Sequence, residues 1–135
     1  VCDFPTKEFL RHEKVILMPH IGASTEEAED NCAVMAADQL RDFLENGNIK
    51  NSVNFPTISL ESNGGVRLAI VNENVSGMLS KILSVLADKN INVVDMLNKS
   101  RNDIAYNLID VESTPDDDTI ASIEAIEHVT RAWIV

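Results

Sequence analysis

Short apolar runs and longer segments with apolar residues three or four positions apart alternate along residues 66–135. Strands are predicted at 66–71, 91–97, 105–111 and 129–135, and helices at 77–88 and from Thr114-Pro115 onward. This strand–helix–strand–strand–helix–strand order predicts an α+β, ferredoxin-like βαββαβ domain. Its four-stranded antiparallel sheet should carry both helices on one face.

The details of these elements are also predictable. In helix 77–88 the residues expected to face inward are Met78, Ile82, Val85 and Leu86, and in the second helix they are Ile120, Ile123 and Ile126. Thr114 is expected at the N-cap of the second helix, with Pro115 at its first position. The polar segment 100–103 predicts a hairpin turn.

The pattern before residue 57 predicts a short buried strand at 14–18, followed by one long helix. Ser24 and Glu27 fit a capping box at the start of the helix, and Gly47 should end it. One apolar stripe is expected to run along it: Ala28, Cys32, Met35, Ala36, Leu40, Phe43 and Leu44. One strand and one helix bury too little surface by themselves. Residues 1–56 are therefore expected to be the remnant of larger domains.

Two adjacent glycines, Gly64 and Gly65, mark the division between the halves, because glycine pairs are poor in helix and strand interiors. We predict a linker at 57–65 and a separate domain at 66–135.

Composition narrows the function classes. The net charge of −11, from 22 acidic and 11 basic side chains, repels phosphate backbones and argues against nucleic-acid binding. No apolar run approaches the roughly 20 residues that span a bilayer, and no export signal begins the chain, so a cytoplasmic protein is expected. Two cysteines make neither a disulfide framework nor a zinc site, and the run 116–118 lacks EF-hand spacing, so no metal is expected.

Two segments carry candidate chemistry. His20 has an imidazole suited to proton transfer, although a histidine at a strand end is more often structural, and the sequence identifies no orienting carboxylate for it. In the loop before helix 77–88, Asn72 and Asn74 are expected on one side of the strand end, and Gly77 allows a ligand close to the backbone. The helix N-terminus there would seat the carboxylate of a free amino acid. The alternative is that these residues only form a turn and a cap.

Residues 15–28, with the run Pro19-His20-Ile21-Gly22-Ala23, resemble the segment around the catalytic histidine of the D-3-phosphoglycerate dehydrogenases. Asp3-Phe4-Pro5 is similar to the turn just upstream in that family, and residues 52–56 to the end of its substrate domain. The second half is similar to its regulatory ACT domain.

The resemblance implies that the intact enzyme oxidises 3-phosphoglycerate to 3-phosphohydroxypyruvate with NAD, in L-serine synthesis. It implies that His20 is the catalytic acid/base, and that His20, Ile21, Gly22 and Ala23 line the nicotinamide pocket. The partner carboxylate, the substrate arginine and the glycine-rich cofactor loop are expected upstream of Val1. This chain alone is therefore expected to be inactive.

The resemblance also implies an effector site. In several members of the family, L-serine binds between two ACT domains of a dimer, and Asn74 and Asn92 match the two asparagine positions of that site, Asn92 across the dimer. Asn72 stands where the serine-inhibited bacterial form has histidine, and Ser76 replaces the usual proline. Two hypotheses follow: a homodimeric module that binds an amino-acid effector, and a purely structural ACT module that holds an oligomer together.

Overall fold

The protein is described by a computed structural model covering all 135 residues. It contains two compact units, Val1–Ala37 and Asp38–Val135. Helix α1 (Glu26–Asn46) begins in the first unit and ends in the second. A single turn of 3-10 helix, η1 (Phe9–Arg11), is the other regular element of the first unit.

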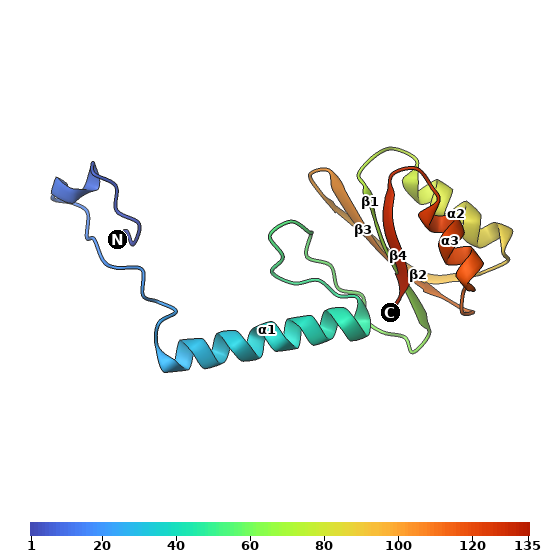
Figure 1. Ribbon diagram of the computed structural model, residues 1–135, viewed down its shortest axis with the longest axis horizontal. Coiled ribbons are helices and arrows are strands. Elements are labelled where there is room, and N and C mark those ends of the chain that lie inside the picture. Colours follow the sequence, from blue (N-terminus) through green and yellow to red (C-terminus); the bar gives the residue numbers. More distant parts are fainter. The chain divides into compact units, whose positions relative to one another are not determined.

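The second unit has the predicted ferredoxin-like fold (Figure 1). Its elements are β1 (Val66–Glu73), α2 (Met78–Asp88), β2 (Val93–Arg101), β3 (Ile104–Val111), α3 (Asp117–Glu124) and β4 (Val129–Ile134). The strands form one antiparallel sheet in the order β2-β3-β1-β4. The predicted hairpin turn is tighter than expected, because Arg101 already pairs with Ile104 and Asn102 adopts φ 54°.

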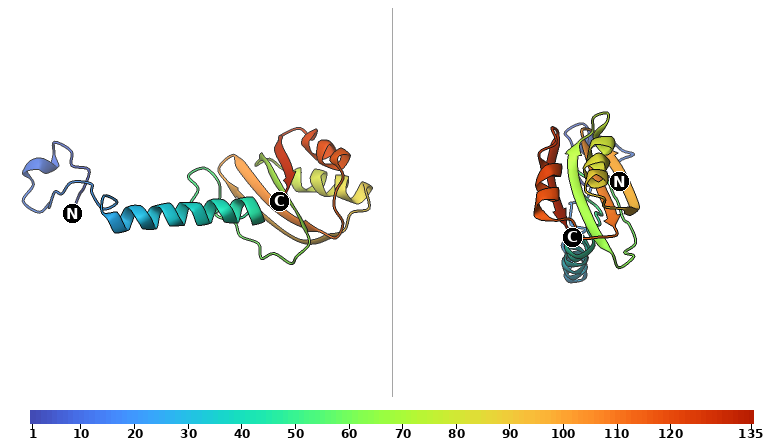
Figure 2. Two further views of the ribbon diagram at one scale, coloured as in Figure 1. Left: turned by 60° about the horizontal axis from the view of Figure 1, so that its bottom comes forward. Right: turned by 90° about the vertical axis from the view of Figure 1, so that its right-hand side faces the viewer.

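Both helices cover the same face of the sheet, as predicted (Figure 2). Leu68 and Ile70 of β1 pack in one buried cluster with Ile82 of α2 and Ile123 of α3. Alternate residues of a strand point to the same face, so this cluster defines the helix-covered side. Val85, Ile120 and Ile126, also predicted to face inward, are half-buried against it.

The opposite face of the sheet is covered by the segment that follows α1. Ile49 and Ile58 pair across an isolated bridge and pack on Ala69, Tyr106 and Leu108. The side chain of Ile58 is fully buried, although the sequence analysis placed it in a linker. The proposed boundaries at 57–65 remain a prediction, but part of this segment contributes to the core.

Gly47 ends α1 as predicted, with φ +70°. A Cβ on this residue would lie 2.8 Å from Leu108 Cδ2, so a larger residue would clash with the core as well as strain the backbone. The chain therefore turns at Gly47, and the segment that follows α1 packs directly on the sheet.

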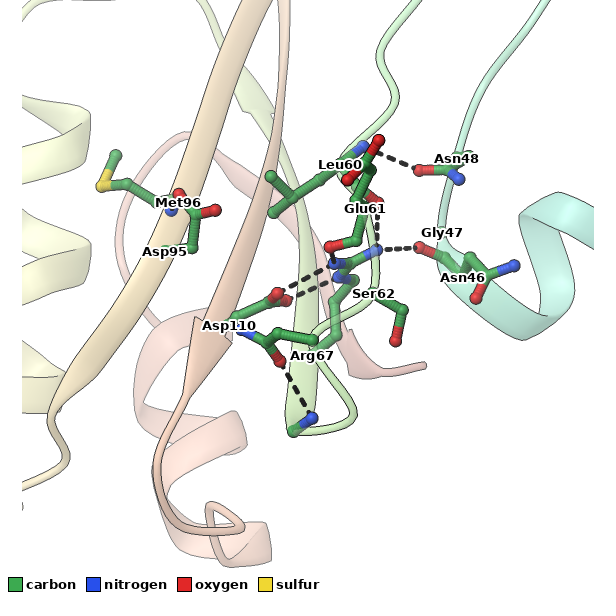
Figure 3. Close-up of polar contacts among 12 residues, drawn as sticks. Asn46, Gly47, Asn48, Leu60, Glu61, Ser62, Arg67, Asp95, Met96 and Asp110 are labelled. Atoms are coloured by element: carbon green, nitrogen blue, oxygen red, sulfur yellow. Dashed lines mark hydrogen bonds and ion pairs between the residues drawn. The ribbon is translucent and has the colours of Figure 1, made fainter.

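Arg67 fastens this covering segment to the sheet (Figure 3). Its Nε and Nη2 donate to the Asp110 carboxylate at 2.6 and 2.8 Å. The remaining hydrogen bonds go to backbone oxygens of Asn46 (3.0 Å), Leu60 (2.9 Å) and Glu61 (3.0 Å). The five N–H donors of a guanidinium therefore match five acceptors.

Both predicted helix caps were wrong in position. The α1 cap is Thr25, not Ser24, because the Ala28 N–H donates to Thr25 Oγ1 (3.2 Å). The α3 cap is Asp116, not Thr114, since Asp116 Oδ1 accepts from the Thr119 N–H (2.8 Å) and hydroxyl (2.6 Å). In each case a later residue supplies an oxygen closer to the open N–H groups.

The predicted buried strand at 14–18 was also wrong. Leu17 makes one isolated bridge with Cys2, and Ile16 is 68% exposed. The first unit offers this segment no neighbouring strand and no core. The stripe on α1 is likewise exposed at Met35 and Leu40, whereas Phe43 packs against the second cluster.

None of the helices has the length and apolar character needed to cross a membrane.

Candidate functional site

A hollow of about 190 Å³ lies where β1 passes into α2. Asn72, Asn74 and Gly77, three of the residues predicted for an effector site, all line it. Gly77 precedes α2 in the left-handed conformation (φ 85°), which reverses the chain direction between strand and helix. Pockets for drug-sized ligands measure about 300–1,000 Å³, so this hollow suits a smaller molecule.

The first turn of α2 forms one side of the hollow, through Met78, Leu79 and Ser80. No side chain caps this helix. Its first N–H groups therefore keep their partial positive charge and their donor capacity. No charged side chain lines the hollow, so this helix end is its main electrostatic feature.

Asn72 is 3% exposed and its carboxamide is bound on both sides. Its Nδ2 donates to the Glu73 carbonyl oxygen (2.6 Å), and its Oδ1 accepts from Asn107 Nδ2 (2.7 Å). Asn107 Nδ2 also donates to the Ile70 carbonyl oxygen (3.2 Å). A buried amide left without such partners would cost about 1–3 kcal/mol, so this network holds Asn72 in one orientation.

Asn74 is exposed and connects the loop to the β2–β3 turn. Its Nδ2 donates to the Asn102 carbonyl oxygen (3.0 Å), and its backbone N–H donates to the Asp103 carbonyl oxygen (2.9 Å). These two bonds place the Asn74 side chain at the rim of the hollow and leave its Oδ1 as an acceptor.

Asn98 and Asn107 belong to the same region, and the sequence analysis did not identify them. Asn98 of β2 lines the hollow, and its Nδ2 donates to Asn107 Oδ1 (2.6 Å). Asn107 is completely buried between Tyr106 and Leu108, in a strand made mostly of apolar residues. A carboxamide inside such a strand must have partners, which was the available signal.

Asn92 does not reach the hollow within one chain. Its carbonyl oxygen accepts from the Glu112 N–H, beside the end of β3, whereas Asn72 pairs with Ala105 near the start of β3. The two residues therefore lie at opposite ends of the sheet. Any shared role requires a second copy of the chain.

His20 lies in the first unit, where Asp3 provides a carboxylate partner that the sequence analysis missed. His20 Nδ1 and Asp3 Oδ2 are 2.5 Å apart, and the Phe4 ring lies 4.4 Å from the imidazole centroid. The side chains of His20 and Asp3 are 58% and 45% exposed. A carboxylate at Nδ1 fixes the ring and supports proton transfer at Nε2.

The residues predicted to line the nicotinamide pocket lie on an exposed segment of the first unit. His20, Ile21, Gly22 and Ala23 are all exposed, and a Cβ on Gly22 would meet nothing within 4 Å. These residues by themselves do not enclose a nicotinamide ring.

Sequence comparison identifies relatives over nearly the whole chain, although no protein-family model matches it. D-3-phosphoglycerate dehydrogenase of Escherichia coli K12 is 32% identical over 132 residues, which are 96% of this chain and 32% of the relative. The Haemophilus influenzae enzyme of that name is 33% identical over 97% of this chain and 32% of its own length. D-3-phosphoglycerate dehydrogenase 2 of Saccharomyces cerevisiae is 36% identical over 80% of this chain and 24% of its own length.

Solved structures with similar folds include the ACT domain of GTP pyrophosphokinase from Chlorobium tepidum, with a TM-score of 0.42 and 17% identity over 52% of this chain and 95% of that one. The regulatory subunit of aspartate kinase from Thermus thermophilus gives a TM-score of 0.46 and 12% identity over 60% of this chain and 56% of that one. The fold assignment rests on the element and strand order described above.

The chain spans about a third of the length of its bacterial relatives. Along nearly all of its own length, the chain is homologous to proteins named D-3-phosphoglycerate dehydrogenase.

Proposed function

We propose that this chain is the regulatory part of an NAD-dependent D-3-phosphoglycerate dehydrogenase, and that its ACT domain binds a small amino acid in the hollow at the start of α2. L-serine is the first candidate. The observation that carries the proposal is the uncapped start of α2 facing carboxamide side chains across an uncharged hollow.

An amino acid is complementary to this arrangement. Its carboxylate suits the open N–H groups of the first turn of α2, where the helix dipole favours negative charge. Its ammonium group needs acceptors, and Asn74 and Asn98 offer carboxamide oxygens at the hollow. The absence of charged lining residues fits a ligand with no net charge.

A homodimer would complete the site. The edge strands β2 and β4 each leave one row of backbone hydrogen-bonding groups unpaired. Pairing of an edge strand with a second copy about a two-fold axis would extend the sheet and bring Asn92 of that copy toward the joint. We propose that Asn92 acts only in this way.

The alternative is a structural ACT module that holds an oligomer together without a ligand. One observation favours it: both polar groups of Asn72 are already satisfied inside the chain. Asn72 would then be part of a core network and not a ligand-binding residue.

For the whole protein we propose oxidation of 3-phosphoglycerate with NAD, in the cytoplasm, within L-serine synthesis. His20 would take the proton of the reacting hydroxyl, with Asp3 holding its ring. Because residues 20–23 are exposed and enclose no cofactor, this chain alone should show no dehydrogenase activity.

Calorimetric titration of the purified chain with L-serine, glycine and D-serine tests the effector proposal. Saturable binding selective for L-serine supports an effector domain. Absence of heat with all three ligands would contradict the proposal and favour the structural module.

A further inference from the structure

Three carboxamides from three neighbouring strands form a continuous ladder beneath the hollow. Asn98 and Asn107 are cross-strand partners, and Asn107 pairs with Ile70, two residues before Asn72 on β1. All three asparagines therefore point to the helix-covered face, in the direction of Ile70. The start of α2 lies over this same face.

The hydrogen bonds of the ladder run in one direction. The Glu73 carbonyl oxygen can only accept, so the amide nitrogen of Asn72 must face it and the Asn72 oxygen must face Asn107. Asn107 then presents its nitrogen to Asn72 and its oxygen to Asn98. Two backbone carbonyl oxygens, those of Glu73 and Ile70, thus set the orientation of the amides in the row.

The ladder ends at Asn98, whose nitrogen is directed at Asn107. Its Oδ1 is left as an acceptor beside the hollow, while the Oδ1 of Asn72 is already used. Asn98 cannot exchange its nitrogen and oxygen without placing two oxygens against each other at Asn107. The hollow therefore has an acceptor of fixed position and no competing carboxylate.

We propose that Asn98 seats the ammonium group of the bound amino acid, and that the fully buried Asn107 is the positioning residue that fixes the Asn98 oxygen. Asn72 acts through the ladder and not by direct contact with the ligand. This inference rests on the proposed effector function and assigns the recognition of the amino group within that site.

The test compares L-serine with L-glycerate, which replaces the ammonium group by a hydroxyl, in calorimetric titrations of the full chain. The unmodified chain should bind L-serine more tightly than L-glycerate by about tenfold or more, as expected for a hydrogen bond to a charged group. Asn98→Leu should lower the affinity for L-serine more than that for L-glycerate, and should therefore remove most of this preference. Asn107→Leu should also reduce the preference, although Asn107 does not contact the ligand. Asn31→Leu, at an exposed position on α1, serves as the matched control.

The outcomes separate the two proposals. If the chain prefers L-serine and Asn98→Leu retains the full preference, the role of Asn98 is overturned while the effector function stands. If the unmodified chain binds neither compound nor any other amino acid, the effector function fails and the inference fails with it. Asn98 is exposed, so its variant should fold even if Asn107→Leu does not.

Discussion

Arg67 and Asp110, 43 residues apart in the sequence, form a buried bidentate ion pair between β1 and β3. Their side chains are 7% and 2% exposed. The hydrogen bond to Asp110 raises the pKa of Arg67 although burial opposes the charged form. Because the same guanidinium binds three backbone oxygens of the segment 46–61, the pair joins the covering segment to the sheet.

Arg67→Met should destabilise the second unit by about 3–5 kcal/mol, because it leaves the Asp110 carboxylate buried without its partner. Urea unfolding followed by the fluorescence of Trp133, the single tryptophan, measures the change. Arg131→Met is the control, since that side chain is 72% exposed and its loss should cost less than about 0.5 kcal/mol. Equal stability of the two variants would refute the role given to Arg67.

Ile58→Ala should cost about 2–5 kcal/mol of unfolding free energy, because it opens a cavity in the cluster that covers the second face of the sheet. Val53→Ala, at a position 90% exposed, provides a control in the same segment. Denaturant midpoints at equal slope give the comparison. An effect of Ile58→Ala as small as the control would show that the segment is a linker after all.

Because Tyr106 is buried, we expect the stability of the fold to decrease at alkaline pH. Burial raises its pKa well above the ordinary value of 10.0, with the Arg67 charge opposing, and its hydroxyl donates to the Gly47 carbonyl oxygen (2.9 Å). The folded state therefore favours the protonated phenol. Its contribution to stability is complete below pH 10 and is lost as the pH rises toward the folded-state value.

Because Tyr106 is the single tyrosine, the absorbance of tyrosinate reports this group alone. Ionisation should appear together with unfolding, detected by circular dichroism, and not near pH 10 in the folded protein. A tyrosinate signal near pH 10 with the fold intact would mean that Tyr106 is accessible to solvent.

We expect the stabilisation of α3 by the Asp116 cap to depend on pH in the acid range. Hydrogen bonds from the hydroxyl and backbone N–H of Thr119 lower the pKa of Asp116. Its stabilisation of α3 is therefore complete above the ordinary carboxyl pKa of 3.8 and is lost as the pH falls through the lowered value. Asp116→Ala should lower the thermal midpoint at neutral pH, whereas Thr114→Ala should not. The reverse result would restore Thr114 as the cap.

Local patterns along the chain were sufficient to predict the order and approximate bounds of the elements in the ferredoxin-like fold. Ile82 belongs to a series of apolar residues at helical spacing on α2, and Ile123 to another on α3. This periodicity directly identifies the buried face of each helix. The same reasoning failed at 14–18, where an apolar run has no neighbouring strand to pair with. Apolar character alone does not supply a tertiary partner.

Contacts between residues far apart in the sequence could not be predicted from local patterns. The pairing of Arg67 with Asp110 and the packing of Ile58 depend on which strands become neighbours. At the hollow, Asn72, Asn74 and Gly77 were predictable because they lie close together in the sequence, between the end of β1 and the start of α2. Asn98 and Asn107 reach Asn72 only through the sheet register, so their positions follow from the structure and not from spacing.

The most direct test of the effector site is the change in backbone and side-chain amide NMR signals on adding L-serine to the isotope-labelled chain. We expect saturable shifts at the N–H groups of Met78, Leu79 and Ser80 and at the side-chain amide of Asn98, with residues of α1 before Ala37 unaffected. Saturable shifts confined to other surfaces, or no shifts at any concentration, would contradict a binding site at the start of α2.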